Sequence, residues 1–459
     1  MKKAFLKLFI LLYIFSLNIS TIYAEKNNNI EPKTKLIDKN HSLNILAESA
    51  ILMDAKTGEI LYEKNMNEEL YPASITKLMT VLLALEYGKL DEIITFSEAA
   101  IFGIERNSSH IALDVGEQIT LEQCLYAILL QSANEASLGV AEHIGGSKEG
   151  FAKMMNEKAK SLGCKNTNFT NPNGLHDNNH YTSAYDMALI AKEVLKYDKF
   201  REIIKTLKYD IPPTNKQKET RHLYAQHQMI KPPSIYVYEG CQGGKTGFTN
   251  EALNTLVTYA KKDDTELIAV VLKDTGANTY VDTKILFDYG FENYKTLNVF
   301  SKDDFSTTKE INQTYKKETF NIGKLKIEAE NDIYITIKKS DENQNYTQKI
   351  NLNENIGNSI NQGDIVGLLN IYENENKVGS TNLIASNTII PISEEDLKEK
   401  ENEILKLKLI KIIKILIILI TILMTLMIII KNIRYKKMLE KRKLNRRKRF
   451  NMNNNKIYK

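Results

Sequence analysis

The chain has 459 residues, of which 42% are hydrophobic and 26% are charged, as is usual for a globular protein. This composition excludes a wholly disordered chain, a collagen-like fibre and a polytopic membrane protein. The net charge is +5, yet residues 431–459 hold 13 Lys/Arg against one acid, so the long region 25–430 is net acidic. A nucleic-acid partner is not expected, because the basic surface that binds it should lie on the folded domain.

The N-terminus has the pattern of a secretory signal. Lys2, Lys3 and Lys7 flank the start of an apolar run, and Ala24 supplies a small residue for cleavage. We expect residues 1–24 to be a signal peptide and 25–44 to be an Asn/Lys-rich linker. An uncleaved anchor helix is the alternative, and in both cases the chain that follows is exported.

The next region combines strands at both ends with helices between them. Strands are expected at 49–54, 59–63, 253–260 and 266–272, and helices at 75–87, 121–143, 151–162, 185–197 and 281–289. The strands of each pair are joined by a turn, at 55–58 and at 261–264, which predicts two hairpins. We therefore expect an α+β domain over 45–295, with one antiparallel sheet and a helical insert.

After about residue 298 the helical period disappears. Short strands are expected at 333–337, 346–351 and 365–371, separated by turns rich in Asn, Gly and Asp. This pattern predicts a small all-β domain over 299–390 that serves as a spacer or docking module.

The C-terminal region predicts a membrane anchor in three segments. A charged juxtamembrane helix is expected over 394–411, a transmembrane helix over 412–430 and a basic cytoplasmic tail over 431–459. The apolar run is long enough only if Lys411 and Lys414 extend toward the membrane surface. A buried core helix is the alternative. The tail either sets topology alone or binds anionic lipid or a cytoplasmic partner.

Three short motifs carry candidate chemistry. In the first, Ser74 precedes Lys77 by three residues, so both side chains would share one face of a helix that begins after Pro72. A serine hydroxyl becomes a good nucleophile when a base takes its proton. Lysine can be that base only when it is neutral, which requires a pKa lowered by burial or by a second cation.

The other two motifs supply groups that such chemistry needs. Ser132 and Asn134 lie in the helical insert, where the hydroxyl can relay a proton and the amide can bind a substrate carbonyl. Lys245 and Gly247 belong to a Lys-Thr-Gly triplet just before a predicted hairpin, which suggests a strand in the sheet. Lys245 can hold a substrate carboxylate and lower the pKa of Lys77. Each motif alone is weak, because each occurs by chance in many chains.

Other catalytic classes lack support in the sequence. There is no CxxC, HExxH or Cys/His cluster, so we expect no metal and no other cofactor. No GxSxG segment is present to pair with the scattered histidines. The three cysteines, Cys124, Cys164 and Cys241, leave at least one thiol unpaired and are expected to be structural.

In their order and spacing, the three motifs resemble those of the penicillin-interacting serine acyl-transferases. The flanking sequence resembles the low-molecular-mass D-alanyl-D-alanine carboxypeptidases, which are penicillin-binding proteins of serine peptidase family S11. The segments that carry this resemblance are 61–65, 71–80, 131–136, 171–175, 181–188 and 244–249. It covers about 45–295 and continues through the β-rich region and the C-terminal helix.

This resemblance implies a fold of the DD-peptidase/β-lactamase type and a role for each candidate residue. Ser74 is the acylated nucleophile, Lys77 its general base, and Ser132 the relay of a proton toward the leaving D-alanine. The implied substrate-binding residues are Asn134, Lys245, Thr246, Gly247 and Phe248, and the backbone N–H groups of Ser74 and Phe248 form the oxyanion hole. The implied partners are peptidoglycan stem peptides, β-lactams as inhibitors, and the membrane.

Three alternatives remain open at this level. An endopeptidase of the same fold would cut D-alanyl crosslinks instead of trimming stems. A β-lactamase is disfavoured because its deacylating carboxylate cannot be placed. A catalytically idle wall-binding scaffold is disfavoured because all three motifs are intact. The family usually has glycine where Leu253 stands, which leaves the local strand packing in doubt.

Overall fold

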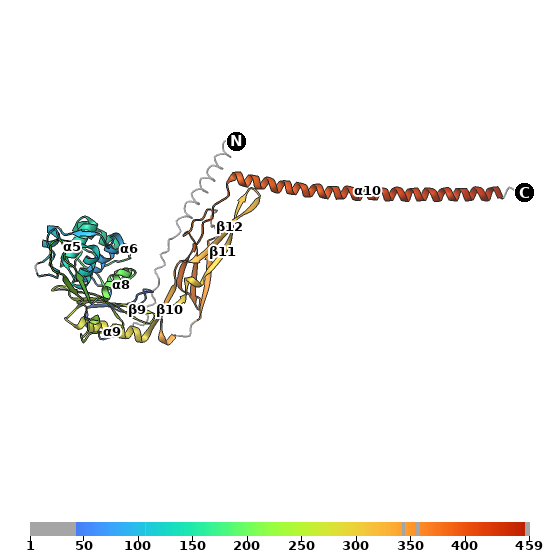
Figure 1. The fold of residues 1–459 in the computed structure, drawn as a ribbon. Coiled ribbons are helices and arrows are strands. Elements are labelled where there is room, and N and C mark those ends of the chain that lie inside the picture. Colours follow the sequence, from blue (N-terminus) through green and yellow to red (C-terminus); the bar gives the residue numbers. More distant parts are fainter. Residues whose placement is uncertain (1–42, 106, 342–344, 354–358, 455–459) are drawn as a thin grey trace, which may run out of the picture. The chain divides into compact units, whose positions relative to one another are not determined.

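Figure 1 shows the fold in a computed structural model, which describes residues 43–105, 107–341, 345–353 and 359–454. The predicted signal peptide, 1–24, and nearly all of the predicted linker, 25–44, lie outside these residues. The contacts of the chain divide it into two compact parts. The first part comprises the chain up to Phe300 together with Ile333–Thr347 and Glu373–Gly379, and the second part comprises Ser301–Asp332, Gln348–Tyr372 and Ser380–Lys459.

The first part is built on a five-stranded antiparallel sheet with strand order β2-β1-β9-β8-β7. Its strands are β1 (Ser49–Asp54), β2 (Ile60–Lys64), β7 (Cys241–Thr249), β8 (Leu253–Lys262) and β9 (Thr265–Asp274). Both predicted hairpins are present, and β1 pairs with β9, so the two ends of the region meet in one sheet. The predicted α+β class with a helical insert is confirmed.

The central strand β9 has a continuous apolar run, Leu267–Leu272, because both faces of the sheet are covered. In β9, Ile268 and Val270 belong to one hydrophobic cluster with the helices of the insert. The alternate residues Leu267 and Ala269 belong to a second cluster with Phe287 of α9 (Asn278–Asn293). Since successive strand residues point to opposite faces, burial on both sides removes the polar alternation of a half-exposed strand.

The helical insert lies between β2 and β7. Its helices are α2 (Lys77–Tyr87), α3 (Glu98–Phe102), α4 (Leu121–Leu130), α5 (Asn134–Gly145), α6 (Lys148–Ser161), α7 (Ala184–Val194) and α8 (Asp198–Lys205). Two small hairpins accompany them, β3 (Ile93–Thr95) with β4 (Gln118–Thr120) and β5 (Lys208–Ile211) with β6 (Arg221–Tyr224). Residues 121–143, predicted as one helix, form two helices, α4 and α5, with a break between Leu130 and Asn134.

Leu253 stands at the position where the family usually has glycine, and its backbone conformation is one that favours glycine. Leu253 begins β8 with φ 53°, in the left-handed region that glycine adopts without steric cost. The strand nevertheless pairs in register, with Thr249 opposite Leu253 across the β7–β8 turn. The doubt raised from the sequence therefore concerns backbone strain at one residue and not the strand pairing.

We predict that Leu253→Gly makes the first part more stable than Leu253→Ala by about 1 kcal/mol, because only the alanine retains the left-handed steric penalty. Both substitutions remove the same half-buried side chain, so their difference isolates the backbone effect. Denaturant unfolding of both variants measures it. A Leu253→Ala variant that is more stable than Leu253→Gly would show that Leu253 carries no strain, because alanine loses less backbone entropy on folding.

A short two-stranded sheet ends the first part. In it, β10 (Tyr294–Phe300) pairs with β13 (Ile333–Lys338). The buried Asp54 carboxylate at the end of β1 accepts hydrogen bonds from the hydroxyls of Thr296 and Thr336, and so ties these strands to the main sheet. The sequence analysis assigned the strand at 333–337 to the small β-rich region, whereas the contacts of this strand group it with the first part.

A second five-stranded sheet has the order β11-β12-β16-β15-β14. Its strands are β11 (Ser306–Tyr315), β12 (Glu318–Ala329), β14 (Tyr346–Leu352), β15 (Ile365–Glu373) and β16 (Asn376–Ala385). The strands predicted at 346–351 and 365–371 are present. The sequence did not predict β11, β12 and β16, because Thr, Lys, Glu and Asn occupy many of their positions.

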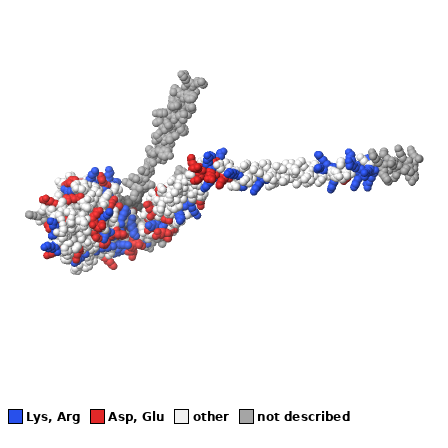
Figure 2. Space-filling model, turned by 45° about the horizontal axis from the view of Figure 1, so that its top comes forward, with Lys and Arg blue, Asp and Glu red and all other residues white. Residues whose placement is uncertain are grey.

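The C-terminal region is one helix, α10 (Glu394–Asn454), of 61 residues. It includes the predicted juxtamembrane helix and transmembrane helix and most of the predicted tail, without a break. Figure 2 shows charged side chains gathered at its beginning, an uncharged stretch, and then a basic segment. Among the described residues it is the one helix long and apolar enough to cross a membrane, judged by length and composition.

Candidate active site

The structure brings the three sequence motifs together in the first part. The Lys77 amine lies 2.9 Å from Ser74 Oγ and 2.7 Å from Asn134 Oδ1. The Lys245 amine lies 3.0 Å from Ser132 Oγ. Segments that are far apart in the sequence therefore meet here, and five polar side chains make the contacts between them.

Ser74 is held by a strained turn between the sheet and helix α2. It lies in a short 3₁₀ turn, η1 (Ala73–Thr76), and not in the first turn of an α-helix as the sequence suggested. Ala73 has φ 51°, a conformation that costs a non-glycine residue about 1–2 kcal/mol. The Thr255 hydroxyl donates a 2.8 Å hydrogen bond to the Pro72 carbonyl and so fixes the turn against β8.

Gly247 lets strand β7 approach this turn. A β-carbon at Gly247 would lie 2.9 Å from the Ser74 backbone nitrogen and 2.3 Å from Thr255 Oγ1. Both are closer than ordinary van der Waals contact, so a side chain here would push the strand away from Ser74. Phe248 follows on the same strand with its side chain exposed.

Lys77 is fully buried among oxygen atoms. Besides Ser74 and Asn134, its amine donates to the backbone carbonyl of Asn173 at 2.5 Å. Burial lowers the pKa of Lys77 well below its usual value, and the nearby charge of Lys245 lowers it further, while Glu135 acts in the opposite direction. A buried amine with these neighbours favours the neutral form.

Lys245 extends from strand β7 to the break between α4 and α5. Its amine donates to Ser132 Oγ and to the Thr246 carbonyl at 2.7 Å. Ser132 has φ 58°, so the chain turns sharply there and its hydroxyl faces the strand. Burial lowers the pKa of Lys245 to about 7. Two buried amines thus flank the serine hydroxyls, with only amide, carbonyl and hydroxyl oxygens as direct partners.

The turn at 171–175 contributes a partner that sequence reasoning assigned no role. The Asn173 carbonyl accepts from Lys77, and the Asn171 side chain accepts from the Gly174 N–H at 2.7 Å, which holds the turn in place. The Thr80 hydroxyl donates to the Pro172 carbonyl, linking the turn to α2. This segment was part of the family resemblance, which was the available signal, but a backbone carbonyl leaves no residue-type signature.

His180 contacts the 3₁₀ turn that contains Ser74. Its Nδ1 accepts a hydrogen bond from the Thr170 N–H at 3.0 Å, so the proton resides on Nε2, which donates to Thr76 Oγ1 at 2.8 Å. Burial lowers the pKa of His180 to about 4, so the ring is neutral at physiological pH. The ring therefore orients Thr76 without adding a third positive charge beside the two lysines.

Metal and thiol chemistry find no site in the part of the chain that the structure describes. Its residues contain no group of three or more His, Cys, Asp or Glu side chains that could hold a metal ion. The three cysteines are unpaired thiols, and burial raises the pKa of each.

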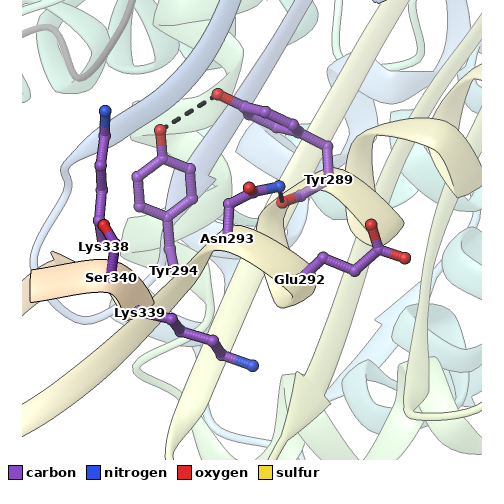
Figure 3. A pocket seen from close by; sticks show the side chains of 7 residues that line it. All are labelled: Tyr289, Glu292, Asn293, Tyr294, Lys338, Lys339 and Ser340. Carbon is purple, nitrogen blue, oxygen red and sulfur yellow. Dashed lines mark hydrogen bonds between the residues drawn. The ribbon is translucent and has the colours of Figure 1, made fainter. Parts of the chain in front are cut away.

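Figure 3 shows a hollow of about 260 Å³ in the first part, away from the predicted residues. Its lining comprises Tyr289, Glu292, Asn293, Tyr294, Lys338, Lys339 and Ser340. The two tyrosine hydroxyls lie 3.1 Å apart and face each other across one wall. It shares no residue with the lysine–serine site, so we place the chemistry at the latter.

Comparison with known proteins agrees with this geometry. Residues 36–276 match the peptidase S11 family of D-alanyl-D-alanine carboxypeptidases, and residues 294–390 match the C-terminal domain of penicillin-binding protein 5. D-alanyl-D-alanine carboxypeptidase DacF of Bacillus subtilis (strain 168) is 39% identical, over 70% of this chain and 80% of DacF. DacA of Haemophilus influenzae is 30% identical, over 75% of this chain and 86% of its own length.

Solved structures are similar in fold. Penicillin-binding protein 5 from Haemophilus influenzae matches with a TM-score of 0.60 and 27% identity, over 76% of this chain and 99% of that structure. The Streptomyces K15 DD-transpeptidase matches with a TM-score of 0.51 and 28% identity, over 55% of this chain and 99% of that structure. The first match therefore extends beyond the region that the second covers.

We predict that Gly174→Ala unfolds or severely destabilises the first part, because its β-carbon would lie 1.9 Å from the Ala73 carbonyl oxygen. Gly146 provides a matched control, since it has a similar φ, +72° against +80°, but an added β-carbon there would meet no atom within 4 Å. Gly146→Ala should cost only about 1 kcal/mol. Thermal unfolding compares the two, and equal losses in Tm would contradict the tight packing of Gly174.

Proposed function

The chain belongs to peptidase family S11, the D-alanyl-D-alanine carboxypeptidases, and we propose that it trims the terminal D-alanine from peptidoglycan stem peptides through an acyl-enzyme on Ser74. It is an enzyme of the serine type. The observation that carries the proposed mechanism is the set of three oxygens around the Lys77 amine, Ser74 Oγ, Asn134 Oδ1 and the Asn173 carbonyl.

This set of contacts can also be made by a neutral lysine. A neutral amine has two N–H groups and one lone pair. The Asn134 and Asn173 oxygens can only accept, so they take the two hydrogens and leave the lone pair facing the Ser74 hydroxyl at 2.9 Å. The lowered pKa of Lys77 favours the same form. Lys77 then removes the proton as Ser74 attacks the substrate carbonyl.

Lys245 and Ser132 serve the other end of the reacting bond. The terminal carboxylate of the stem peptide binds beside Lys245 and Thr246, and its negative charge favours the protonated form of that lysine. Attack of Ser74 Oγ on the carbonyl carbon gives a tetrahedral intermediate. When it collapses, the bond to the terminal D-alanine nitrogen breaks, and the proton that Lys77 took from Ser74 passes through the Ser132 hydroxyl to that nitrogen, which leaves Lys77 neutral again. Asn134 aligns the peptide. Water then hydrolyses the ester and restores the Ser74 hydroxyl.

The oxyanion of the tetrahedral intermediate needs donors that are already in place. We assign this role to the backbone N–H groups of Ser74 and Phe248. The close approach of Gly247 to the Ser74 nitrogen supports the assignment, because it brings the strand that carries Phe248 to the nucleophile. A β-lactam resembles the D-alanyl-D-alanine terminus and would acylate Ser74 in the same way, which makes the enzyme penicillin-sensitive.

We further propose that the enzyme is exported and anchored by a single span. The apolar stretch 412–430 of α10 supplies the span, and the basic segment after it favours the cytoplasmic side. The catalytic domain would then face the cell wall. The predicted signal peptide at 1–24 supplies the export route, and the domain boundaries given above remain part of this proposal.

The test uses the full chain in detergent and a stem peptide that ends in D-Ala-D-Ala. Mass spectrometry measures the release of D-alanine from this peptide. Wild type should release one D-alanine per peptide, and Ser74→Ala should lose at least about 1,000-fold in rate, since a missing nucleophile leaves only binding and the oxyanion hole. Ser161→Ala, an exposed serine at the end of α6, is the control and should match wild type.

The outcomes also separate the alternatives. Acylation of Ser74 by penicillin without release of D-alanine would favour the crosslink endopeptidase, which digestion of crosslinked dimers would then identify. Failure of both reactions in a folded protein would favour a wall-binding scaffold. Rapid turnover of penicillin itself would indicate a β-lactamase.

A further inference from the structure

The turn between β11 and β12 lies beside the first turns of α10. We name residues Tyr315–Lys316–Lys317–Glu318 the hairpin tip. Lys316 forms a 2.6 Å ion pair with Glu401, and Glu318 forms a 2.7 Å ion pair with Lys408. All of these residues belong to the second part of the chain. The tip therefore runs alongside α10 as far as Lys408.

Two further contacts make this arrangement more than a pair of surface charges. The Gln313 side chain both donates to and accepts from the backbone of Ile392, at 3.1 and 2.8 Å, just before α10 begins. Leu397 in the first turns of the helix is buried. Because surface ion pairs alone are weak, the amide contacts and the buried leucine are what hold the helix beside the hairpin.

The position of Lys408 sets the height of the tip above the membrane. Ile412, where the proposed span begins, is four residues further along the helix, or about 6 Å at 1.5 Å per residue. The headgroup layer on each side of the hydrocarbon core is about 5–8 Å thick. The tip therefore stands at the outer edge of the headgroup layer, where its side chains can reach lipid.

The chemistry of the tip suits that location. Lys317 is exposed, and the Lys316 amine lies 5.0 Å from the centre of the Tyr315 ring. Lys411 and Lys414 add positive charge at the start of the proposed span. Tyrosine and lysine are the side chains that membrane interfaces favour, and lysines near the surface are attracted to anionic lipid.

We propose that the hairpin tip is a second membrane contact, which binds anionic lipid headgroups on the outer face of the membrane. This inference rests on the proposed span. A single helix leaves the domain it carries free to tilt, because its only attachment is one point. A contact to one side of the helix resists that tilt, so the hairpin tip limits how far the second part can tilt on the membrane.

The chain has no tryptophan, so one introduced indole reports on its own position. Tyr315→Trp places it in the tip, and Ser306→Trp places it at the other end of β11, about 30 Å away along the strand. The full chain carrying either substitution is reconstituted in vesicles of phosphatidylcholine with phosphatidylglycerol. Nitroxide lipids labelled in the headgroup then quench the indole according to its depth. Matching Tm values in detergent confirm that both variants are folded.

We expect the Tyr315→Trp indole to emit at shorter wavelength and lose intensity to the headgroup nitroxide, while the Ser306→Trp indole does neither. Lys317→Glu in the Tyr315→Trp chain should reduce that quenching. Equal quenching of the two indoles, in protein that floats with the vesicles, would contradict the second membrane contact but not the membrane anchor. Quenching that Lys317→Glu leaves unchanged would have the same meaning. Protein that does not float with the vesicles would contradict the membrane anchor, and with it the second membrane contact.

Discussion

The burial of two lysine amines a short distance from two serine hydroxyls is the constraint on which the rest of the first part depends. Lys77 and Lys245 are both almost fully buried, and no carboxylate contacts either amine directly. Two protonated amines in such a place would repel each other and lack water. The arrangement is stable when one of them is neutral. Burial lowers the pKa of both amines, and the charge of Lys245 lowers the pKa of Lys77 further, so we take Lys77 to be the neutral one.

The scaffold holds these groups through strained backbone at the points where the chain enters the site. Ala73 precedes Ser74 and Ser132 carries the second hydroxyl, and both adopt left-handed backbone conformations. Each such residue costs about 1–2 kcal/mol, which the buried packing on both faces of the sheet offsets. Two of the strained residues are those that aim the serines, and the neighbouring strands β1 and β9 are almost entirely buried.

The sequence predicted most of the architecture because its strongest signals are periodic. The apolar strands at 49–54 and 266–272 and the helix that ends at Gly88 were recognisable from pattern and turn residues. The break between α4 and α5 was not, since Gln131–Ala133 contains neither proline nor glycine. The strands β11 and β12 were hidden because their exposed faces carry Thr, Lys and Glu at most positions.

The site was predictable to the extent that it consists of side chains in short motifs. The motifs singled out Ser74, Lys77, Ser132, Asn134 and Lys245, and the structure brings their side chains into contact. What could not be found was backbone: the Asn173 carbonyl accepts from Lys77, and any residue type could supply it. His180 was also missed, because its contact with Thr76 arises only when the turn after α6 folds back on η1.

The most direct test of the account is the pH dependence of Ser74 acylation by a chromogenic β-lactam, compared between wild type and Lys245→Met. In the proposed mechanism acylation requires neutral Lys77, so its rate should rise with pH through the Lys77 pKa and level off well below the ordinary lysine pKa. Removing the Lys245 charge should raise the Lys77 pKa and move the midpoint to higher pH. A wild-type midpoint at the ordinary lysine value, or one that Lys245→Met leaves in place, would contradict the account.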